Sequence, residues 1–157
     1  MKIKLIIIGK TDEKYLLEGI DKYCGRLKHY TNFDQIVIPD IKLGGKLTLD
    51  KLREEEGKLM LSKLENADYV ILLDEKGKEH TSVDFANFIQ KKLNAGASSL
   101  VFIVGGAYGF SAEVYKRANE KLSFSQMTFS HQMIRLFFTE QLYRAFTILK
   151  GEKYHHQ

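Results

Sequence analysis

The sequence predicts one α/β domain over residues 1–157, in which a parallel-rich sheet is flanked by helices. Short runs of branched aliphatic residues alternate along the chain with segments of helical periodicity. The runs are continuous and do not alternate with polar residues, which is typical of strands buried on both faces. Two of them, in the carboxyl-terminal third, stop at loops of small or polar residues, as parallel strands do at the edge where ligands bind.

The first half of the chain reads as strand, helix, strand, helix. The expected segments are a strand over 3–8, a helix after Thr11, a strand over 33–38, a loop over 41–49 and a helix over 47–64. Gly9 and Pro39 end the two strands, and Thr11 is expected to cap the first helix. The helix over 47–64 carries a run of charges that includes Glu56, which we interpret as a solvated face.

The second half continues the alternation. The expected segments are a strand over 69–73, a helix capped by Ser82, a strand over 100–104, a short helix over 111–119, a strand over 122–125 and a last helix over 131–150. Gly96 suits the carboxyl-terminal cap of the helix that Ser82 begins. Strands that alternate with helices in this way predict a parallel sheet with helices on both faces.

The composition is that of a soluble globular protein, with 44% hydrophobic and 28% charged residues. No apolar stretch approaches the roughly 18 residues needed to cross a bilayer, and the apolar amino terminus reads as a buried strand rather than a signal peptide. The single cysteine, Cys24, excludes a disulfide within the chain and gives no metal cluster. A net charge of +4 favours polyanionic partners only slightly. We expect a cytoplasmic protein that binds neither membrane nor metal.

A glycine-rich segment, GGAYG, begins at Gly105, directly after the strand over 100–104. It is not the dinucleotide-binding fingerprint, whose spacing is Gly-x-Gly-x-x-Gly and which an acid follows about 20 residues later. It is either a plain turn or a place where a ligand approaches the backbone, and its position after a buried strand favours the ligand. Gly105 is therefore expected to leave room for that ligand.

The segment SFSQMTF, which ends at Phe129, offers hydroxyls, an amide, a thioether and two aromatic rings without a charge. This set suits a flat heteroaromatic ring such as adenine, and it equally suits the polar exit of a core strand. His131 follows at the start of the last helix, where a histidine can be a cap, a solvated residue or a catalyst. The sequence has no nucleophile-elbow Gly-x-Ser-x-Gly and no zinc-binding His-Glu-x-x-His.

The last helix is apolar nearly all round. One stripe consists of Ile134, Phe138, Leu142, Ala145, Phe146 and Leu149. Leu136 and Tyr143 lie on other sides, and because the sheet can cover only one side we expect a partner subunit on another. Arg135 and Arg144 interrupt this helix and are expected to meet an anion, a carboxylate or a salt-bridge partner in a second subunit.

Several segments together resemble one known family. They are KIKLIIIGK, LLDEKGK, VGGAYGF, LSFSQMTFSHQMIR and TEQLYRAFTILKGEKYH. The chain resembles, over essentially its whole length, the RlmH family of large-subunit ribosomal RNA methyltransferases, which belongs to the SPOUT class. The resemblance implies a carboxyl-terminal trefoil knot, a homodimer, and transfer of a methyl group from S-adenosylmethionine to N3 of a pseudouridine. The implied substrate is 23S ribosomal RNA within the large subunit or the assembled ribosome.

Carried over residue by residue, the resemblance implies that the cofactor contacts lie at three loop ends. They are Leu73, Gly105, Phe124, Ser125, Gln126, Met127, Thr128 and Phe129. The candidates for removing the proton from N3 are His131, Tyr154 and His155. Arg135 and Arg144 are the candidates for binding RNA.

The chain departs from the family at Ser130, where proline is common, and this removes a restraint on φ at the helix entrance. The tail from Tyr154 onward has no helix to extend, yet it carries groups that stack on bases and donate to phosphate. We expect the tail of one subunit to complete the site of the other. The alternative function is a non-catalytic RNA-binding module, which would not bind S-adenosylmethionine.

Overall fold

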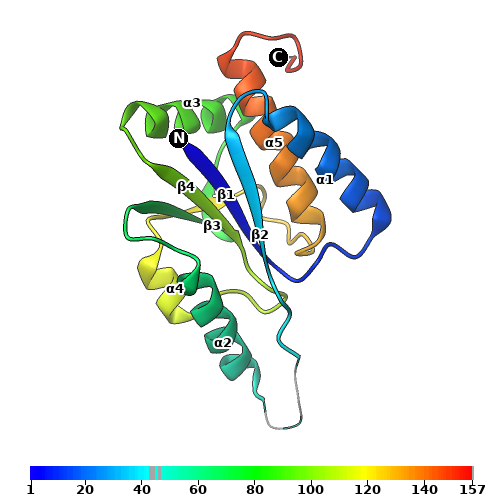
Figure 1. Cartoon of the computed structure of the whole chain (residues 1–157), viewed down its shortest axis with the longest axis vertical. Helices are drawn as coiled ribbons and strands as arrows, with labels where there is room; N and C mark the ends of the chain where they lie inside the picture. The colour runs from blue at the N-terminus through cyan, green and yellow to red at the C-terminus, as the bar shows by residue number, and fades with distance from the viewer. Residues whose placement is uncertain (43–44, 46, 157) are drawn as a thin grey trace.

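The computed structural model describes residues 1–42, 45 and 47–156, and in these residues strands alternate with helices (Figure 1). The elements are β1 (Lys2–Ile8), α1 (Lys14–Leu27), β2 (Asn32–Ile38), α2 (Leu49–Ser62), β3 (Asp68–Glu79), α3 (Ser82–Asn94), β4 (Ser99–Val104), α4 (Ala112–Arg117), β5 (Glu120–Ser123) and α5 (Met133–Leu149). Part of the expected loop over 41–49, at positions 43, 44 and 46, lies outside the described residues.

The strands form one sheet in the order β2-β1-β4-β3-β5. Every pairing in the described sheet is parallel, from Lys2 opposite Asn32 at one edge to Ile71 opposite Glu120 at the other. All six residues of the central strand β4 are buried. The predicted parallel α/β architecture is therefore confirmed, and the carboxyl ends of β3, β4 and β5 meet at one edge.

The two faces of the sheet explain why its strands are continuously apolar. Along β1, Ile3, Leu5 and Ile7 join one core cluster, whereas Ile6 and Ile8 join another on the opposite face. Helices α1, α3 and α5 cover the first cluster, and α2 and α4 cover the second (Figure 1). Among the described residues, none of these helices combines the length and apolar character needed to cross a membrane.

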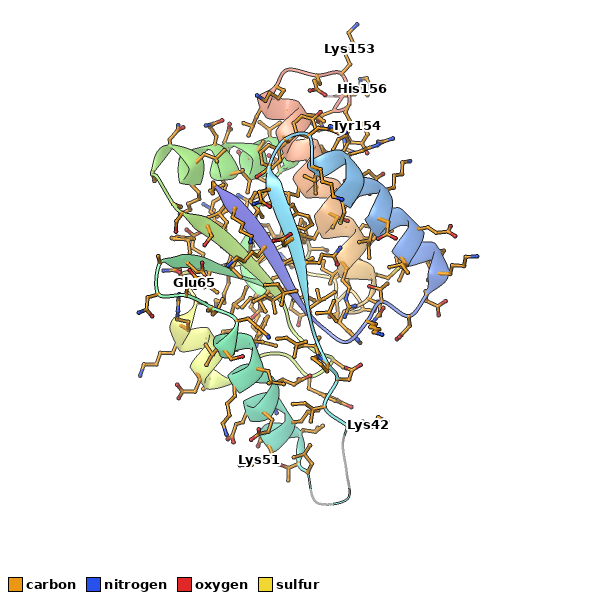
Figure 2. All side chains as sticks on the ribbon, viewed as in Figure 1. Lys42, Lys51, Glu65, Lys153, Tyr154 and His156 are labelled. Atoms are coloured by element: carbon orange, nitrogen blue, oxygen red, sulfur yellow. The ribbon has the colours of Figure 1, made fainter. Side chains whose placement is uncertain are left out.

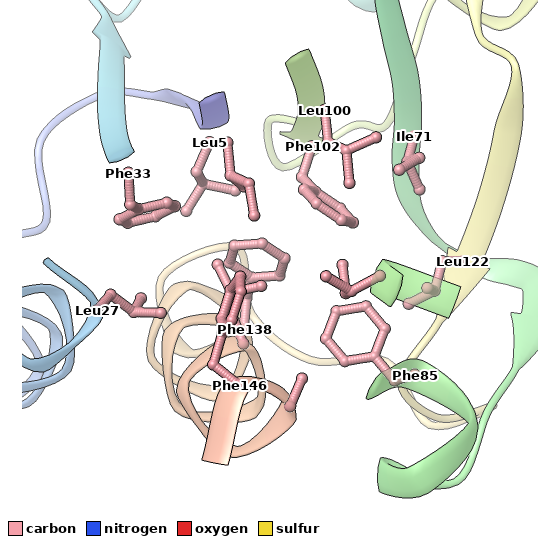
Figure 3. Close-up of a cluster of buried hydrophobic side chains, with 14 of the residues drawn as sticks. Leu5, Leu27, Phe33, Ile71, Phe85, Leu100, Phe102, Leu122, Phe138 and Phe146 are labelled. Atoms are coloured by element: carbon pink, nitrogen blue, oxygen red, sulfur yellow. The ribbon is translucent and has the colours of Figure 1, made fainter. Parts of the chain in front are cut away.

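An aromatic cluster holds α5 against the sheet (Figure 3). The ring centroids of Phe102 on β4 and Phe138 on α5 are 4.7 Å apart. Phe124, which follows β5, packs edge-on against both Phe138, at 6.3 Å, and Phe85 of α3, at 6.2 Å. Each fully buried ring of this size contributes about 1.5–3 kcal/mol through burial alone, so the start of α5 is firmly placed relative to β4 and β5.

Two expected helix caps are wrong. Helix α1 begins at Lys14 and its N-cap residue, Glu13, makes no side-chain cap bond; the hydroxyl of Thr11 instead accepts a hydrogen bond from Arg135 Nη1 at 3.1 Å. Thr81, not Ser82, caps α3, because its hydroxyl accepts from the backbone N–H of Asp84 at 3.0 Å. Strand β5 both begins and ends two residues earlier than expected, and because it ends at Ser123, Phe124 lies in the loop that follows it.

Part of the second face of α5 is covered by α1 of the same chain, although Phe137 on α5 is 38% exposed. A Cβ atom on Gly19 of α1 would lie 2.8 Å from Leu136 Cδ1, so α1 and α5 are in close contact there. Tyr143 packs against Tyr23, with ring centroids 5.8 Å apart, and against Tyr30, at 6.0 Å. The homodimer stays a prediction, and so does the trefoil knot, because strand order does not define how the chain is threaded.

Candidate active site

A cleft of about 660 Å³ opens where the carboxyl ends of β3, β4 and β5 meet. Three segments far apart in the sequence form its walls: residues 73–76, where the pairing of β3 with β5 is irregular, the glycine loop over 105–110 after β4, and residues 122–131 around the end of β5. Its volume lies within the range of small-molecule sites. The cleft is therefore at the sheet edge that the sequence indicated.

Most of the residues expected to contact the cofactor line this cleft. They are Leu73, Gly105, Phe124, Ser125, Met127, Thr128 and Phe129. Gln126 is described too, but it is not part of the lining. Met127 is the most open of them, with 77% of its surface exposed, so its thioether and methyl group are available to a ligand.

The segment after β5 is held by short hydrogen-bonded turns. Ser123 Oγ donates to the carbonyl of Ser125 at 2.8 Å, and Ser125 Oγ accepts from the backbone N–H of Met127 at 3.0 Å. Thr128 donates to Glu75 Oε2 at 2.6 Å, which joins this segment to the irregular part of β3. Side chains of Ser, Thr and Asn type bond to nearby backbone in this manner and restrict loops, so this wall of the cleft has a defined shape.

The glycine loop has two kinds of glycine. Gly109 has φ of +84°, a left-handed conformation that glycine adopts without strain, and a Cβ atom there would meet nothing within 4 Å. Gly105 differs, because its Cβ atom would lie 3.3 Å from the ring of Phe110. The absent side chain at 105 thus makes room for Phe110, while Gly105 itself lines the cleft; its contact with a cofactor stays a prediction.

A buried carboxyl group lies against the same loop. Glu56 of α2 is only 5% exposed, and a Cβ atom on Gly106 would lie 2.7 Å from its Oε2 atom. Its Oε1 atom has no hydrogen-bond partner among the described residues. Burial, and to a smaller extent the nearby Asp40, raises the pKa of Glu56 above its ordinary 4.5. Placing Glu56 on a solvated face was wrong, since a run of charges does not distinguish its inward-facing member.

The sequence also missed a tyrosine and acids in the cleft wall. Tyr115 of α4 lines the cleft beside Asp74, and its hydroxyl donates to Asp74 Oδ2 at 2.6 Å. Burial, assisted by this hydrogen bond, raises the pKa of Tyr115 to about 12. The sequence placed Asp74 directly after a strand over 69–73, and although β3 in fact continues to Glu79, that position was a usable signal; nothing in the sequence around Tyr115 marks it.

His131 lines the cleft at the entrance of α5. Burial, together with the guanidinium of Arg135, lowers the pKa of His131 below its ordinary 6.5, so the ring is neutral at neutral pH. Ser130, which stands where proline is common in the family, accepts a hydrogen bond on Oγ from the backbone N–H of Met133 at 3.0 Å. A proline cannot accept such a bond, and the hydroxyl therefore restrains the helix entrance in another way.

Arg135 does not face the surface, which corrects its expected role in binding RNA. It is 0% exposed. Its Nη2 atom donates to the carbonyl of Ile8 at 2.6 Å, Nη1 donates to the carbonyl of Gly9 at 2.9 Å, and Nε donates to the carbonyl of His131 at 3.0 Å. The guanidinium therefore ties the entrance of α5 to the end of β1.

Comparison with known proteins agrees with this arrangement. A family model described as "Predicted SPOUT methyltransferase" matches residues 1–155. The chain belongs to the SPOUT methyltransferase family. Proteins named "Ribosomal RNA large subunit methyltransferase H" are similar along their whole length and that of this chain: one from Christiangramia forsetii is 56% identical, one from Flavobacterium johnsoniae 57% and one from Porphyromonas gingivalis 49%.

In this SPOUT methyltransferase chain, the other catalytic candidates lie far from the cleft. Tyr154 and His155 follow α5, whose 17 residues begin just after His131. Figure 2 labels Tyr154 near the carboxyl end of the chain. At 1.5 Å per residue, a helix of that length is about 25 Å long. The structure therefore does not bring His131 together with Tyr154 and His155 within one chain.

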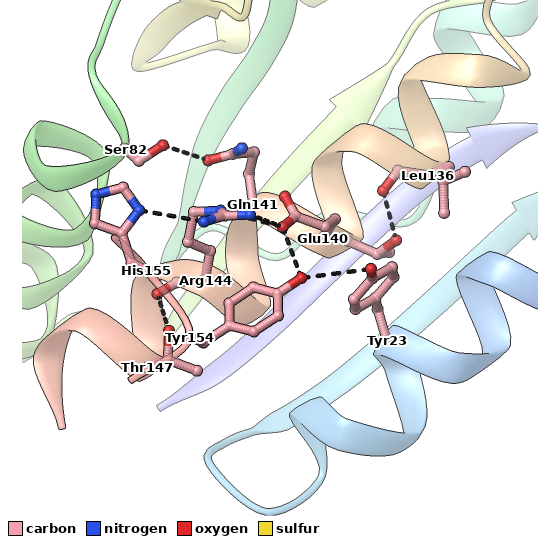
Figure 4. A network of polar contacts seen from close by, with 10 residues as sticks. Tyr23, Ser82, Leu136, Glu140, Gln141, Arg144, Thr147, Tyr154 and His155 are labelled. Atoms are coloured by element: carbon pink, nitrogen blue, oxygen red, sulfur yellow. Dashed lines mark hydrogen bonds and ion pairs between the residues drawn. The ribbon is translucent and has the colours of Figure 1, made fainter. Parts of the chain in front are cut away.

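The tail of the SPOUT methyltransferase folds back on α5 (Figure 4). Tyr154 donates to Glu140 Oε1 at 2.9 Å, and its ring centroid is 4.7 Å from that of Tyr143. Burial, with hydrogen bonds to Tyr23 and Glu140, raises the pKa of Tyr154. The tyrosine hydroxyl is therefore held by Glu140 and Tyr23 in its own chain, and its catalytic role stays a prediction.

Proposed function

We propose that the protein transfers a methyl group from S-adenosylmethionine to N3 of a pseudouridine in 23S ribosomal RNA. The observation that carries this proposal is the cleft at the carboxyl edge of β3, β4 and β5, lined by the segments that resemble the family's cofactor site. The full-length similarity to proteins named as large-subunit ribosomal RNA methyltransferases supports the substrate class.

The residues of the cleft fit this cofactor. Hydroxyls of Ser125 and Thr128 and backbone groups of the glycine loop provide hydrogen bonds without a charge, while Phe124 and Phe129 provide aromatic surface. This chemistry suits an adenine ring with an uncharged hydrogen-bonding edge. When bound, S-adenosylmethionine supplies a methyl group already attached to a good leaving group. The chain must then orient the two reactants, which can supply about 7–11 kcal/mol of the barrier reduction.

The remaining task of the protein is to deal with the proton on N3. His131 lines the cleft and its lowered pKa keeps the ring neutral, so the ring can accept a proton. We assign the removal of the N3 proton to His131, with Arg135 fixing the backbone at that position through the carbonyl of His131.

The proposed partners are ribosomal RNA in the large subunit or the assembled ribosome, and a second copy of the chain. Because Tyr154 lies about one helix length from the cleft of its own chain, the tail can serve a cleft only in another copy. Arg144, which is partly exposed next to the tail, is kept as an RNA-binding candidate. A cytoplasmic location follows from this substrate.

The decisive experiment is a methyl-transfer assay with labelled cofactor on free RNA, isolated large subunits and assembled ribosomes, followed by mapping of the modified base. Incorporation at N3 of a pseudouridine in one of these substrates is the expected result. The alternative, a non-catalytic RNA-binding module, predicts no incorporation and no heat of binding with S-adenosylhomocysteine at millimolar concentration. Methylation of another atom would retain the enzyme class and reject the proposed acceptor.

A further inference from the structure

The second glycine of the loop after β4 makes room for a carboxyl group. A Cβ atom on Gly106 would lie 2.7 Å from Oε2 and 2.8 Å from Oε1 of Glu56, so this carboxyl group of α2 takes up the space of the missing side chain. Gly106 itself lines the cleft, whereas Glu56 does not. A single glycine residue thus lies between the cleft and a carboxyl group on a residue that is 5% exposed.

Glu56 has an interaction left to make. Its Oε1 atom has no hydrogen-bond partner among the described residues, and neither has Nε of Arg53, one turn earlier on α2, so the helix does not pair these two groups. Arg53 pairs with Asp50 instead, at 2.6 Å between Nη2 and Oδ1. Burying a carboxyl group without a partner costs stability. A buried ionisable group of this kind, next to a cleft, is a candidate functional residue.

The neighbours of Glu56 do not neutralise it. Asp40, which follows β2, carries the same charge and acts against the ionisation of Glu56. The glycine loop, GGAYGF, has no charged residue, and its one titratable side chain, Tyr108, is exposed. From α4, the hydroxyl of Ser111 lies against Gly57, the residue after Glu56. The surroundings that the structure describes therefore supply a negative charge and no ion-pair partner.

We propose that Glu56 makes the cleft prefer S-adenosylmethionine to its product, S-adenosylhomocysteine, by attracting the positive charge that only the methyl donor carries on sulfur. The proposal rests on the proposed function. A positive charge near a carboxyl group favours its ionised form, and the attraction is stronger where protein rather than water lies between the charges. Glu56 thereby selects the methyl donor and favours release of the product.

Two other acids, Asp74 and Glu75, line the cleft directly. Their carboxylates already accept hydrogen bonds, Asp74 from Tyr115 at 2.6 Å and Glu75 from Thr128 at 2.6 Å. Glu75 is exposed and Asp74 is partly exposed, so water screens both charges. Glu56 is shielded from water, and its response to a charge in the cleft is correspondingly larger.

The test is calorimetry of the wild-type protein with S-adenosylmethionine and with S-adenosylhomocysteine, from pH 4.5 to neutral pH. By linkage, a ligand that lowers the pKa of Glu56 gains affinity, relative to one that does not, as the pH rises. The ratio of the two dissociation constants should therefore grow with pH in favour of S-adenosylmethionine. We expect growth of about tenfold, which corresponds to a difference of one pKa unit between the two complexes.

Two variants of α2 separate Glu56 from other charges. Glu56→Gln keeps the shape of the side chain and removes the ionisable group, so the ratio should no longer grow with pH. Glu54→Gln is the matched control, because it removes the same charge from an exposed position of the same helix, and it should leave the growth intact. Thermal melting without ligand checks that both variants are folded, and the wild-type pH series needs no variant at all.

The outcomes separate this preference from its rivals and from the proposed function. A ratio that does not change with pH in the wild type would mean that contacts with the methyl group alone distinguish the ligands, and would overturn the proposal. Growth that persists in Glu56→Gln would assign the preference to another group, such as His131 in the cleft, and would overturn it as well. If the wild type binds neither ligand at millimolar concentration, the proposed function fails and the preference fails with it.

Discussion

Replacing the buried Arg135 by alanine is expected to unfold a large fraction of the protein. The side chain is 0% exposed and its guanidinium donates to the carbonyls of Ile8 and Gly9, to the hydroxyl of Thr11, and to the carbonyl of His131 on its own helix. The first three bonds join α5 to the end of β1. Alanine at this position would remove all of them at once.

The magnitude follows from the acceptors left behind. Each buried carbonyl that loses its partner costs about 1–3 kcal/mol, and the carbonyls of Ile8 and Gly9 both do so. The cavity left by a large buried side chain adds to this loss. We expect Arg135→Ala to lower the free energy of unfolding by about 4–6 kcal/mol, which is comparable with the whole stability of many domains. Arg135→Lys keeps the charge but cannot reach three separated acceptors, and about half of the loss should remain.

The assay is equilibrium unfolding in urea, monitored by far-ultraviolet circular dichroism at several protein concentrations, since self-association would make stability depend on concentration. Arg144→Lys is the matched control, because Arg144 pairs with Glu140 at a partly exposed i,i+4 position and such pairs contribute about 0.3–0.5 kcal/mol. An Arg135→Ala variant within about 1 kcal/mol of wild type, but with weaker RNA binding, would refute the structural role and return Arg135 to the RNA surface.

Three further predictions concern other parts of the site. Burial raises the pKa of Glu56 above 4.5, so the folded protein holds this proton more tightly than the unfolded chain, and its stability falls as the pH rises from 4.5 through the folded-state pKa. Glu56→Gln should therefore be more stable than wild type at neutral pH, and the melting temperatures of the two proteins should converge below pH 4.5. A difference in melting temperature that stays constant with pH would count against a buried charge. Phe129 is 38% exposed in the cleft. Phe129→Ala should therefore weaken the binding of S-adenosylhomocysteine about tenfold, as the loss of one stacking ring does, with little change in the free energy of unfolding. Equal affinity of the two proteins by calorimetry would remove Phe129 from the site. Deleting Tyr154 onward should lower methyl transfer at least about tenfold, a loss of about 1.4 kcal/mol, while S-adenosylhomocysteine affinity is unchanged, and full activity would show that the tail is dispensable.

Local periodicity was enough to predict most of the fold. Continuous aliphatic runs predicted strands with both faces covered, and β1 shows why: from Leu5 to Ile8, successive side chains enter the two core clusters in turn, so neither face needs a polar residue there. Boundaries were less predictable. Thr11 resembles a cap in the sequence, yet α1 begins only at Lys14, and the hydroxyl of Thr11 accepts from Arg135, more than a hundred residues away. The cap of α3 was missed by one residue, because Thr81 and Ser82 are both good caps.

The candidate site was predictable where it depends on strand ends, and not where it depends on tertiary contacts. Parallel strands bring their carboxyl ends to one edge, so residues 73–76 and the loops after β4 and β5 could be placed together in advance, although β3 continues to Glu79. The roles of Gly105 and Glu56 could not, because they depend on which neighbour fills the space beside each of them. Arg135 was misplaced for the same reason: its partners are main-chain carbonyls, which leave no trace in a sequence.

Phe124 gives the cleft and the hydrophobic core a common wall. Its ring packs on Phe85 and Phe138, and the residue also lines the cleft. The shape of that wall is consequently set when the protein folds. The wall is preorganised, so ligand binding does not have to order it. A compound that occupies the cleft will raise the melting temperature according to its affinity and concentration, which makes thermal shift a direct screen for inhibitors. Conversely, Phe85 packs on Phe124 but does not itself line this cleft. A substitution at Phe85 can therefore move the ring of Phe124 and change which ligands the cleft prefers.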